Sequence, residues 1–135
     1  MPVTFDSDSI TPEYLESFYR NSEGLPWQAE YGDYMRDPAN FFRIMLIAEE
    51  LEMLCPRRML DIGCGEMHLE EYLSGRLEAE IVTCDLASPR RPRADAVFTI
   101  ADAAALPFAD GVFDAVVCSE AVSYTHLTLP TIYSV

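Results

Sequence analysis

Three acidic residues and two glycines are the residues of this chain whose types and spacing suggest chemistry. Asp61 ends a short apolar run and precedes Gly63 and Gly65, while Asp85 and Asp102 follow two later apolar runs. Glycines at a sharp turn let the backbone pass close to a ligand, because no Cβ stands in the way. This pattern favours a nucleotide-type ligand on the turn. The alternative is a tight strand-to-helix connection that binds nothing.

The spacing of these residues indicates which type of nucleotide the turn could bind. Asp85 lies 22 residues after Gly63, which is the distance at which an acid meets the ribose hydroxyls of a nucleotide held on a glycine turn. A dinucleotide fingerprint requires a third glycine at position 68, where this chain has His68. The order here is Asp-x-Gly-x-Gly, with Asp61 two residues before the first glycine. A dinucleotide such as NAD is therefore disfavoured.

Four apolar runs predict the strands that position these acids. The runs cover residues 58–62, 81–84, 96–100 and 113–118. A helix is predicted over residues 68–73, ending near Gly75, whereas the proline and arginine content of residues 87–95 predicts a loop or a single turn. Strands separated by helices or crossovers indicate an α/β fold with an open parallel sheet. The three acids then stand at the carboxyl ends of neighbouring strands, where such sheets bind ligands.

Two helices joined by an aromatic connector are predicted before the first strand. The first begins at Thr11-Pro12-Glu13 and ends near residues 21–24, and the second begins at Asp37-Pro38 and ends before Pro56. The rings of Trp27, Tyr31 and Tyr34 in the connector either cover the edge of the core or form part of a lid over a ligand. The second helix carries a broad apolar stripe, whose members are Phe41, Phe42, Ile44, Met45, Ile47, Ala48, Leu51 and Leu54.

Composition limits the class of protein. The chain has 135 residues, of which 50% are hydrophobic and 24% charged, as expected of one soluble globular domain. A formal net charge of −14 argues against a nucleic-acid backbone as the main partner. The basic run at residues 90–93 (RRPR) is predicted to be a solvated loop, with a phosphate contact as the alternative. No apolar run is long enough to span a membrane, and residues 1–9 lack the blocks of a signal peptide, so we expect a cytoplasmic protein.

The cysteines do not have the spacing of a metal site. Cys55, Cys64, Cys84 and Cys118 form no Cys-x-x-Cys pair, and the chain has two histidines, too few to complete a zinc site. Three of the four fall at the ends of predicted strands, which favours small, buried, reduced thiols. We therefore predict no metal site.

Three segments of the chain resemble the class I S-adenosylmethionine-dependent methyltransferases, and most closely their small-molecule type 11 group. These segments are LDIGCG at residues 60–65, Asp85 after the second strand, and DAAALPFADGVFDAV at residues 102–116. The resemblance covers about residues 59–120. It implies a Rossmann-like sheet with strand order 3-2-1-4-5-7-6, of which this chain supplies the 3-2-1-4 part. Residues 1–57 then form a helical and aromatic cap, and residues 58–121 a partial cofactor-binding domain.

The resemblance also implies S-adenosylmethionine as the cofactor and gives roles to individual residues. Gly63 and Gly65 make room for the cofactor, and Asp61 helps to hold its methionine ammonium. Asp85 binds the ribose diol, and Asp102 receives the adenine amino group. The full set of cofactor-binding residues implied by the resemblance is Asp61, Gly63, Cys64, Gly65, Asp85, Leu86, Asp102, Ala103 and Ser119.

The reaction that the resemblance implies is methyl transfer to a small-molecule acceptor, by in-line displacement at the sulfonium methyl. The leaving group is already activated, so proximity and orientation supply most of the acceleration, and the need for a general base depends on the acceptor. No convincing base is found, because His68 is predicted to be an exposed helix residue. Met67 replaces the third glycine common in the turn of this family, so the helix after it is expected to approach the ligand differently. A nicotinamide-dependent oxidoreductase and a module that binds the cofactor without transferring methyl are the alternatives.

The final residues, 122–135, continue none of these patterns. The segment VSYTHLTLPT at residues 122–131 resembles the translation of a sequencing-library adapter, so we expect a truncated gene followed by read-through. On this hypothesis His126 has no catalytic role, and the fourth strand is an exposed apolar edge.

Overall fold

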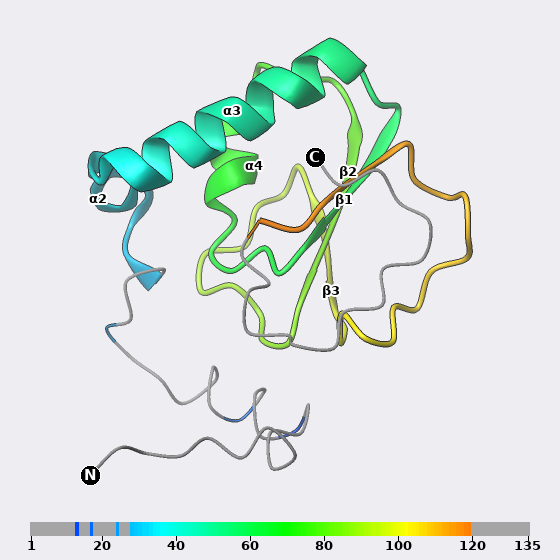
Figure 1. The fold of residues 1–135 in the computed structure, drawn as a ribbon. Coiled ribbons are helices and arrows are strands. Elements are labelled where there is room, and N and C mark those ends of the chain that lie inside the picture. The colour runs from blue at the N-terminus through cyan, green and yellow to red at the C-terminus, as the bar shows by residue number, and fades with distance from the viewer. Residues whose placement is uncertain (1–12, 14–16, 18–23, 25–27, 120–135) are drawn as a thin grey trace, which may run out of the picture.

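The computed structural model describes residues 13, 17, 24 and 28–119 of the chain. Figure 1 shows the helices and strands that lie within these residues. In chain order they are α2 (Tyr31–Arg36), α3 (Pro38–Leu54), β1 (Arg58–Ile62), α4 (His68–Leu73), β2 (Glu80–Asp85), β3 (Val97–Ile100) and β4 (Ala115–Val117). The predicted helix that begins at Thr11, the ring of Trp27 and the predicted read-through segment lie outside the described residues.

The strands form one parallel sheet in the order β3-β2-β1-β4. Leu60 of β1 lies beside Val82 of β2 and Val116 of β4, and Asp85 at the end of β2 lies beside Ile100 of β3. This arrangement confirms the predicted Rossmann-like open sheet and its strand order. β1 and α4 also have the predicted bounds.

The segments that connect the strands determine where each strand begins. Residues 86–96 join β2 to β3 without a helix, as the proline and arginine content predicts. β4 is shorter than the predicted residues 113–118. The Asp114 carboxylate accepts hydrogen bonds from the backbone amides of Arg57 and Arg58, at 2.8 and 3.2 Å, and regular strand pairing begins only at Ala115.

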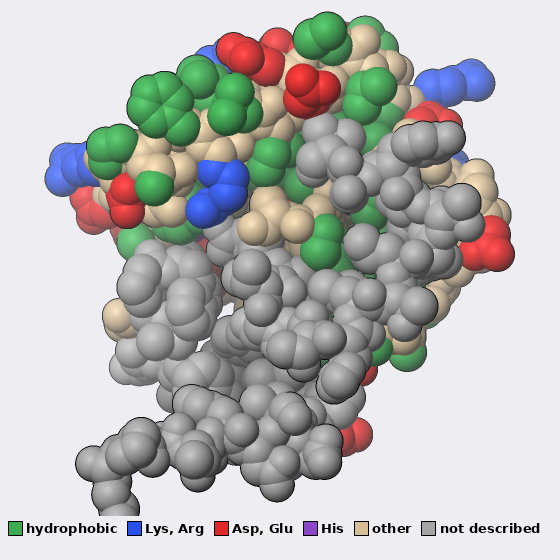
Figure 2. Space-filling view, in the orientation of Figure 1, with side chains coloured by type: hydrophobic (Ala, Val, Ile, Leu, Met, Phe, Trp, Pro, Cys, Tyr) green, Lys and Arg blue, Asp and Glu red, His purple; other side chains and the backbone are tan. Residues whose placement is uncertain are grey.

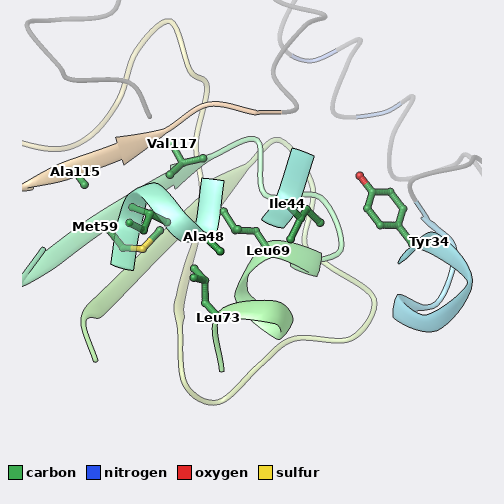
Figure 3. Packing of buried hydrophobic residues seen from close by; sticks show 9 residues of the cluster. Tyr34, Ile44, Ala48, Met59, Leu69, Leu73, Ala115 and Val117 are labelled. Atoms are coloured by element: carbon green, nitrogen blue, oxygen red, sulfur yellow. The ribbon is translucent and has the colours of Figure 1, made fainter. Parts of the chain in front are cut away.

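The main core lies between the sheet and helices α3 and α4, and Figure 3 shows its packing. Its buried members are Tyr34, Ile44, Ala48, Leu51, Met59, Leu69, Leu73, Ala115 and Val117. Side chains alternate along a strand, so Met59 and Asp61 of β1 point to this helical side, whereas Leu60 and Ile62 point to the other side. The alternation therefore carries the Asp61 carboxyl under the helices.

The opposite face of the sheet is covered by a loop in the part of the chain that the structure describes. Residues 101–114 bring the rings of Phe108 and Phe113 against the buried Leu60 and Val116. The two rings meet edge to face, with centroids 5.2 Å apart. This loop is the LPF…FD segment of the sequence motif, so the apolar residues of the motif have a packing role.

The segment before α3 contains a helix that the sequence analysis does not predict. α2 occupies part of the expected aromatic connector, and its N-cap residue Glu30 makes no side-chain capping hydrogen bond. The local start signal is therefore weak, and the helix depends on the burial of Tyr34 in the core. The start of α3 is as predicted, since the Asp37 carboxylate accepts a hydrogen bond of 2.9 Å from the amide of Ala39, with Pro38 in the first turn.

The apolar stripe of α3 is narrower than predicted. Its buried residues are those of the core described above, whereas Phe41, Phe42 and Leu54 of the predicted stripe are exposed. Figure 2 shows hydrophobic side chains on the outer side of this helix, interspersed with acidic ones. In the described part of the chain, no helix combines the length and the hydropathy needed to cross a bilayer.

Candidate functional site

The glycine turn connects β1 to α4 and leaves open space beside its backbone. Gly63 and Gly65 have φ angles of 74° and 53°, in the left-handed region that glycine adopts without strain. The amides of Gly63 and Cys64 donate to the carbonyl of Cys84 on β2, at 2.8 and 3.2 Å, and so fix the turn against the sheet. A Cβ added at Gly65 meets no atom of the protein within 4 Å. The turn is thus firmly held and open on one side.

A pocket lies against this turn. It is bordered by β1, by the start of α4 and by residues from α2 and α3. Several of the predicted cofactor-binding residues line it, namely Asp61, Gly63, Cys64, Gly65 and Ser119. The structure therefore brings these five together, from the end of β1, the turn and the end of β4.

Asp85 joins the site through a hydrogen bond rather than through the lining of this pocket. Its Oδ2 atom accepts from the amide of Gly65 at 2.8 Å, and its Oδ1 atom accepts from the amide of Leu86 at 2.7 Å. One carboxylate thus ties the end of β2 to the middle of the glycine turn. Neither Asp85 nor Leu86 lines the pocket that contains Asp61.

Asp102 and Ala103 lie one strand further along the same edge. The amide of Ala101 donates to the carbonyl of Asp85 at 3.0 Å, so the chain after β3 is held beside the end of β2. The Asp102 carboxylate accepts from the amide of Ala104 at 2.9 Å, which closes a turn. Ala103 is buried in the cluster on the opposite face of the sheet. These two residues are near neighbours of the Asp85 end of the site, but they do not line the pocket.

Asp61 of the pocket lining forms a pair of buried acids with Glu70 of α4, which does not line the pocket itself, and we call these two residues the carboxyl pair. They are 2% and 1% exposed. Three of their four oxygens, Asp61 Oδ1 and both oxygens of Glu70, are buried without a hydrogen-bond donor. The two groups lie in hydrogen-bond contact with each other, and two carboxyls can make that bond only if one of them carries a proton.

Burial raises the pKa values of both members of the carboxyl pair. Loss of hydration, together with the negative charge of Glu70, raises the pKa of Asp61 well above its usual range. Burial also raises the pKa of Glu70. Both shifts favour the protonated form of the pair.

His68 is buried, which corrects the prediction that it is an exposed helix residue. Its exposed fraction is 7%, and its ring stacks on Tyr34 with centroids 4.0 Å apart and an interplanar angle of 20°. Both rings line the pocket. The hydroxyl of Tyr34 in turn accepts a hydrogen bond from the Arg43 guanidinium on α3. Tyr34 thus belongs to the core and to the pocket wall at once, so the two interpretations of the aromatic connector meet in this residue.

Met67 occupies a backbone conformation that favours glycine. Its φ angle is 63°, and its side chain is 1% exposed. An L-residue in this region costs about 1–2 kcal/mol, and the buried thioether side chain offsets that cost. The turn therefore has a glycine-like backbone conformation at Met67, while the large side chain of this residue is buried.

The basic run at residues 90–93 is a loop whose first three residues are exposed, as predicted, and two of its arginines are also anchored to other segments. The Arg91 guanidinium donates to the carbonyls of Gln28 and Ala29, at 3.1 and 3.3 Å. Arg93 is paired with Glu71 on α4 and with Asp95, and its side chain is only 20% exposed. The run therefore fastens the loop after β2 to α4 and to the segment before α2.

The cysteines of the site are protonated thiols rather than nucleophilic thiolates. All four cysteines of the chain are free, and Cys64 and Cys84 are buried as predicted. Burial raises the pKa of Cys84 to about 12 and also raises that of Cys64, so both stay protonated at neutral pH. Among the described residues, no group of three or more histidine, cysteine or acidic side chains is arranged to hold a metal ion.

Sequence reasoning missed Glu66 as a residue of the pocket and Glu70 as the partner of Asp61. A signal for Glu70 exists in the sequence: it lies three residues before Leu73, on the same face of α4, and that face packs on the sheet. Tyr34 was recognised only as one of several rings. Glu66 lines the pocket and accepts a hydrogen bond of 3.1 Å from the amide of Arg90, a contact across 24 residues that spacing does not predict.

The family model described as a methyltransferase domain matches residues 60–132 of the chain. This span includes the site from Asp61 to Ser119. It also runs into residues 122–132, which the sequence analysis attributes to read-through, and that attribution stays a prediction.

Individual proteins are similar to this chain in sequence or in fold. The chain is 26% identical over 136 residues to the chloroplastic tocopherol O-methyltransferase of Arabidopsis thaliana, covering 76% of this chain and 39% of that protein. It is also similar to the structure of the plantazolicin methyltransferase BpumL in complex with a pentazolic desmethylPZN analog and SAH. That comparison gives a TM-score of 0.50 and 17% sequence identity, and it covers 80% of this chain and 49% of that one. The SAH-bound methyltransferase PaMTH1 of Podospora anserina gives a TM-score of 0.49 at 19% identity, covering 88% and 60%. The chain thus spans only part of each relative.

With a family match over more than half of its length and the predicted sheet order, the chain belongs to the type 11 methyltransferase domain family, within the class I S-adenosylmethionine-dependent methyltransferases.

Proposed function

We propose that this chain binds S-adenosylmethionine at the glycine turn and serves the transfer of its methyl group to a small-molecule acceptor. One observation carries the proposal. Asp61 has a buried carboxyl oxygen without a donor, and it lines a pocket beside a turn whose backbone is open to a ligand. A buried carboxyl of this kind is stabilised by a cation that enters the pocket, and the methionine part of the cofactor carries an ammonium group.

The residues of the site fit the parts of this cofactor. Gly63 and Gly65 leave room for its backbone contacts, and Asp61 provides an acceptor for the ammonium group. Asp85 holds the turn with its two oxygens, and each of these oxygens keeps a second lone pair for a ribose hydroxyl. Asp102, one strand further along the edge, provides an acceptor for an exocyclic amino group.

The chemistry of the transfer needs little from the protein besides orientation. When bound, the cofactor supplies a methyl group that is already activated by the sulfonium. The chain holds the ligand by the turn and by the acids, and the rings of Tyr34 and His68 limit the access of water to the pocket wall. Alignment of this kind supplies most of the acceleration of an in-line displacement.

The acceptor class rests on the relatives. One relative is named a tocopherol O-methyltransferase and another a plantazolicin methyltransferase, and these names support a small-molecule acceptor. In this proposal residues 1–57 act as a cap that contributes Tyr34 and Ile44 to the pocket, and residues 58–121 form the cofactor-binding part. The free cysteines support a cytoplasmic location.

Calorimetric titration with S-adenosylhomocysteine and with NAD tests the proposal. We expect S-adenosylhomocysteine to bind and NAD not to bind, because position 68 holds a buried histidine where a dinucleotide fingerprint needs glycine. Binding of NAD alone would instead favour an oxidoreductase. Binding of S-adenosylhomocysteine without turnover of S-adenosylmethionine, across a panel of oxygen, nitrogen and carbon nucleophiles, would favour a module that binds the cofactor without transferring methyl.

A further inference from the structure

Glu70 is a fully buried acid that the proposed cofactor contacts do not use. It lies on α4 and faces Asp61 of β1, and neither of its oxygens has a hydrogen-bond donor in the structure. A buried charge without a donor is among the costliest features a fold can contain. Hydrophobic side chains of the same helix, Leu69 and Leu73, fill the neighbouring core positions. An acid in this row therefore calls for an explanation other than packing.

The charges around the carboxyl pair leave it short of positive partners. From β2, Cys84 and the carboxylate of Asp85 act on Asp61, and Cys64 of the turn lies close by. Arg93 and Asp95 of the following loop act on Glu70. Arg93 is the cation among these groups, and its guanidinium is already engaged by Glu71 and Asp95. His68, which lies two residues before Glu70, stacks on Tyr34 at the pocket wall.

We propose that Glu70 is a positioning residue that shares one proton with Asp61 in the free protein, and that a ligand ammonium group entering the pocket replaces this proton. The inference rests on the proposed function, because it takes the ammonium group from S-adenosylmethionine or its product. The proton leaves to solvent when the ligand binds. The carboxyl pair then changes from one negative charge to two, and the ammonium adds one positive charge, so the buried cluster keeps the same net charge.

This exchange makes binding depend on pH. While the free pair holds its proton and the bound pair does not, the affinity for an ammonium ligand rises up to tenfold for each unit of pH. A ligand with the same nucleoside but no amino group, 5′-methylthioadenosine, releases no proton, and its affinity does not change with pH in this way.

Calorimetry in two buffers of different ionisation enthalpy counts the protons released. At pH 7 we expect the wild-type protein to release about one proton on binding S-adenosylhomocysteine and none on binding 5′-methylthioadenosine. Glu70→Gln is expected to abolish the release, because the amide supplies the missing donor and Asp61 is already ionised. Asp61→Asn abolishes it as well. Glu78→Gln, the same substitution at an exposed position of the loop after α4, is the matched control and retains the release.

The outcomes separate this inference from the proposed function. If S-adenosylhomocysteine binds without proton release, or Glu70→Gln leaves the release unchanged, the inference is overturned and the proposed function stands.

If S-adenosylhomocysteine does not bind, the proposed function fails. The shared proton is then tested in the free protein by carbon-13 NMR of the two carboxyl groups. A joint titration above the ordinary carboxyl range supports the shared proton, and two independent titrations near about 4 overturn it.

Discussion

Asp61 and Asp85 stand at the ends of neighbouring strands on either side of one glycine turn, yet their surroundings are opposite. The Asp85 carboxylate accepts backbone hydrogen bonds from Gly65 and Leu86. Asp61 is buried against Glu70, and its Oδ1 atom has no donor. From the sequence the two acids look alike, because each follows an apolar strand. In the structure one of them is satisfied and the other is not.

This difference indicates that Asp85 has a structural role and Asp61 a binding role. Asp85 is part of the scaffold, because it fixes the shape of the turn before any ligand arrives. Asp61 is held in an unfavourable state, and the proposed function has a ligand cation relieve it, so we expect its position to cost stability in the free protein and to strengthen binding. The same reasoning predicts that substitutions at the two positions change stability and binding in different combinations.

The largest effect is expected for Asp61→Asn. Removal of one partner of a buried ion pair weakens S-adenosylhomocysteine binding by about 3–5 kcal/mol. The stability of the free protein does not fall, because the asparagine amide gives Glu70 the donor that it lacks. Calorimetry measures the first quantity and urea unfolding the second. A variant that loses stability but binds normally would contradict the proposed role of Asp61.

A smaller effect on binding is expected for Asp85→Ala, with a simultaneous loss of stability. Loss of hydrogen bonds to a charged group weakens cofactor binding by about 1.5–3 kcal/mol. The turn also loses two backbone contacts, so the free energy of unfolding falls too. Asp110→Ala removes an exposed carboxylate of the loop before β4 and is the control for the change in net charge. Unchanged affinity in a folded Asp85→Ala protein would remove this residue from the site.

The pH dependence of the free energy of unfolding distinguishes the buried Asp61 from the hydrogen-bonded Asp85 in the protein without ligand. The pKa values of Asp61 and Glu70 are raised above the reference values of 3.8 and 4.5, so the folded chain keeps a proton that the unfolded chain has lost. The contribution of the pair is complete below these reference values and is lost as the pH rises through the folded pKa values. We expect wild-type stability to decline over this range relative to Asp61→Asn, by up to about 1.4 kcal/mol per pH unit. Urea unfolding between pH 5 and about 8 measures it, and parallel curves would contradict the shared proton.

The smallest effect is expected for Met67→Gly, between the two acids. The glycine relieves about 1–2 kcal/mol of backbone strain, but the core loses a buried side chain whose burial contributes about 1.5–3 kcal/mol. The net loss of stability is therefore about 1 kcal/mol. Thermal unfolding measures this loss, and a stabilised variant would show that strain, rather than packing, dominates at this position.

The sequence predicts the scaffold of the site well. β1 and α4 have the predicted bounds, and the strand order is confirmed, because apolar runs, turn glycines and crossover lengths are local signals. Placement of Asp61, the turn and Ser119 in one pocket follows from the same signals, since parallel strands end at one edge.

Features that depend on tertiary contacts could not be predicted in the same way. α2 has no capping signal and depends on the burial of Tyr34. His68 is polar and follows a turn, which suggests exposure, but its stacking on Tyr34 joins residues that lie far apart in the chain. Phe41 and Phe42 look like core residues by composition, yet both are exposed on α3. Glu70 is the clearest case, because its spacing from Leu73 places it on the packed face of α4 but does not show that its carboxyl meets Asp61 of β1.

A crystal structure of the protein with S-adenosylhomocysteine tests the central claim most directly. The claim predicts the amino nitrogen of the ligand within hydrogen-bond distance of Asp61, about 2.7–3.2 Å, and the ribose hydroxyls on the Asp85 carboxylate. A ligand bound in another cavity, or an amino group that touches neither Asp61 nor Glu70, would contradict it.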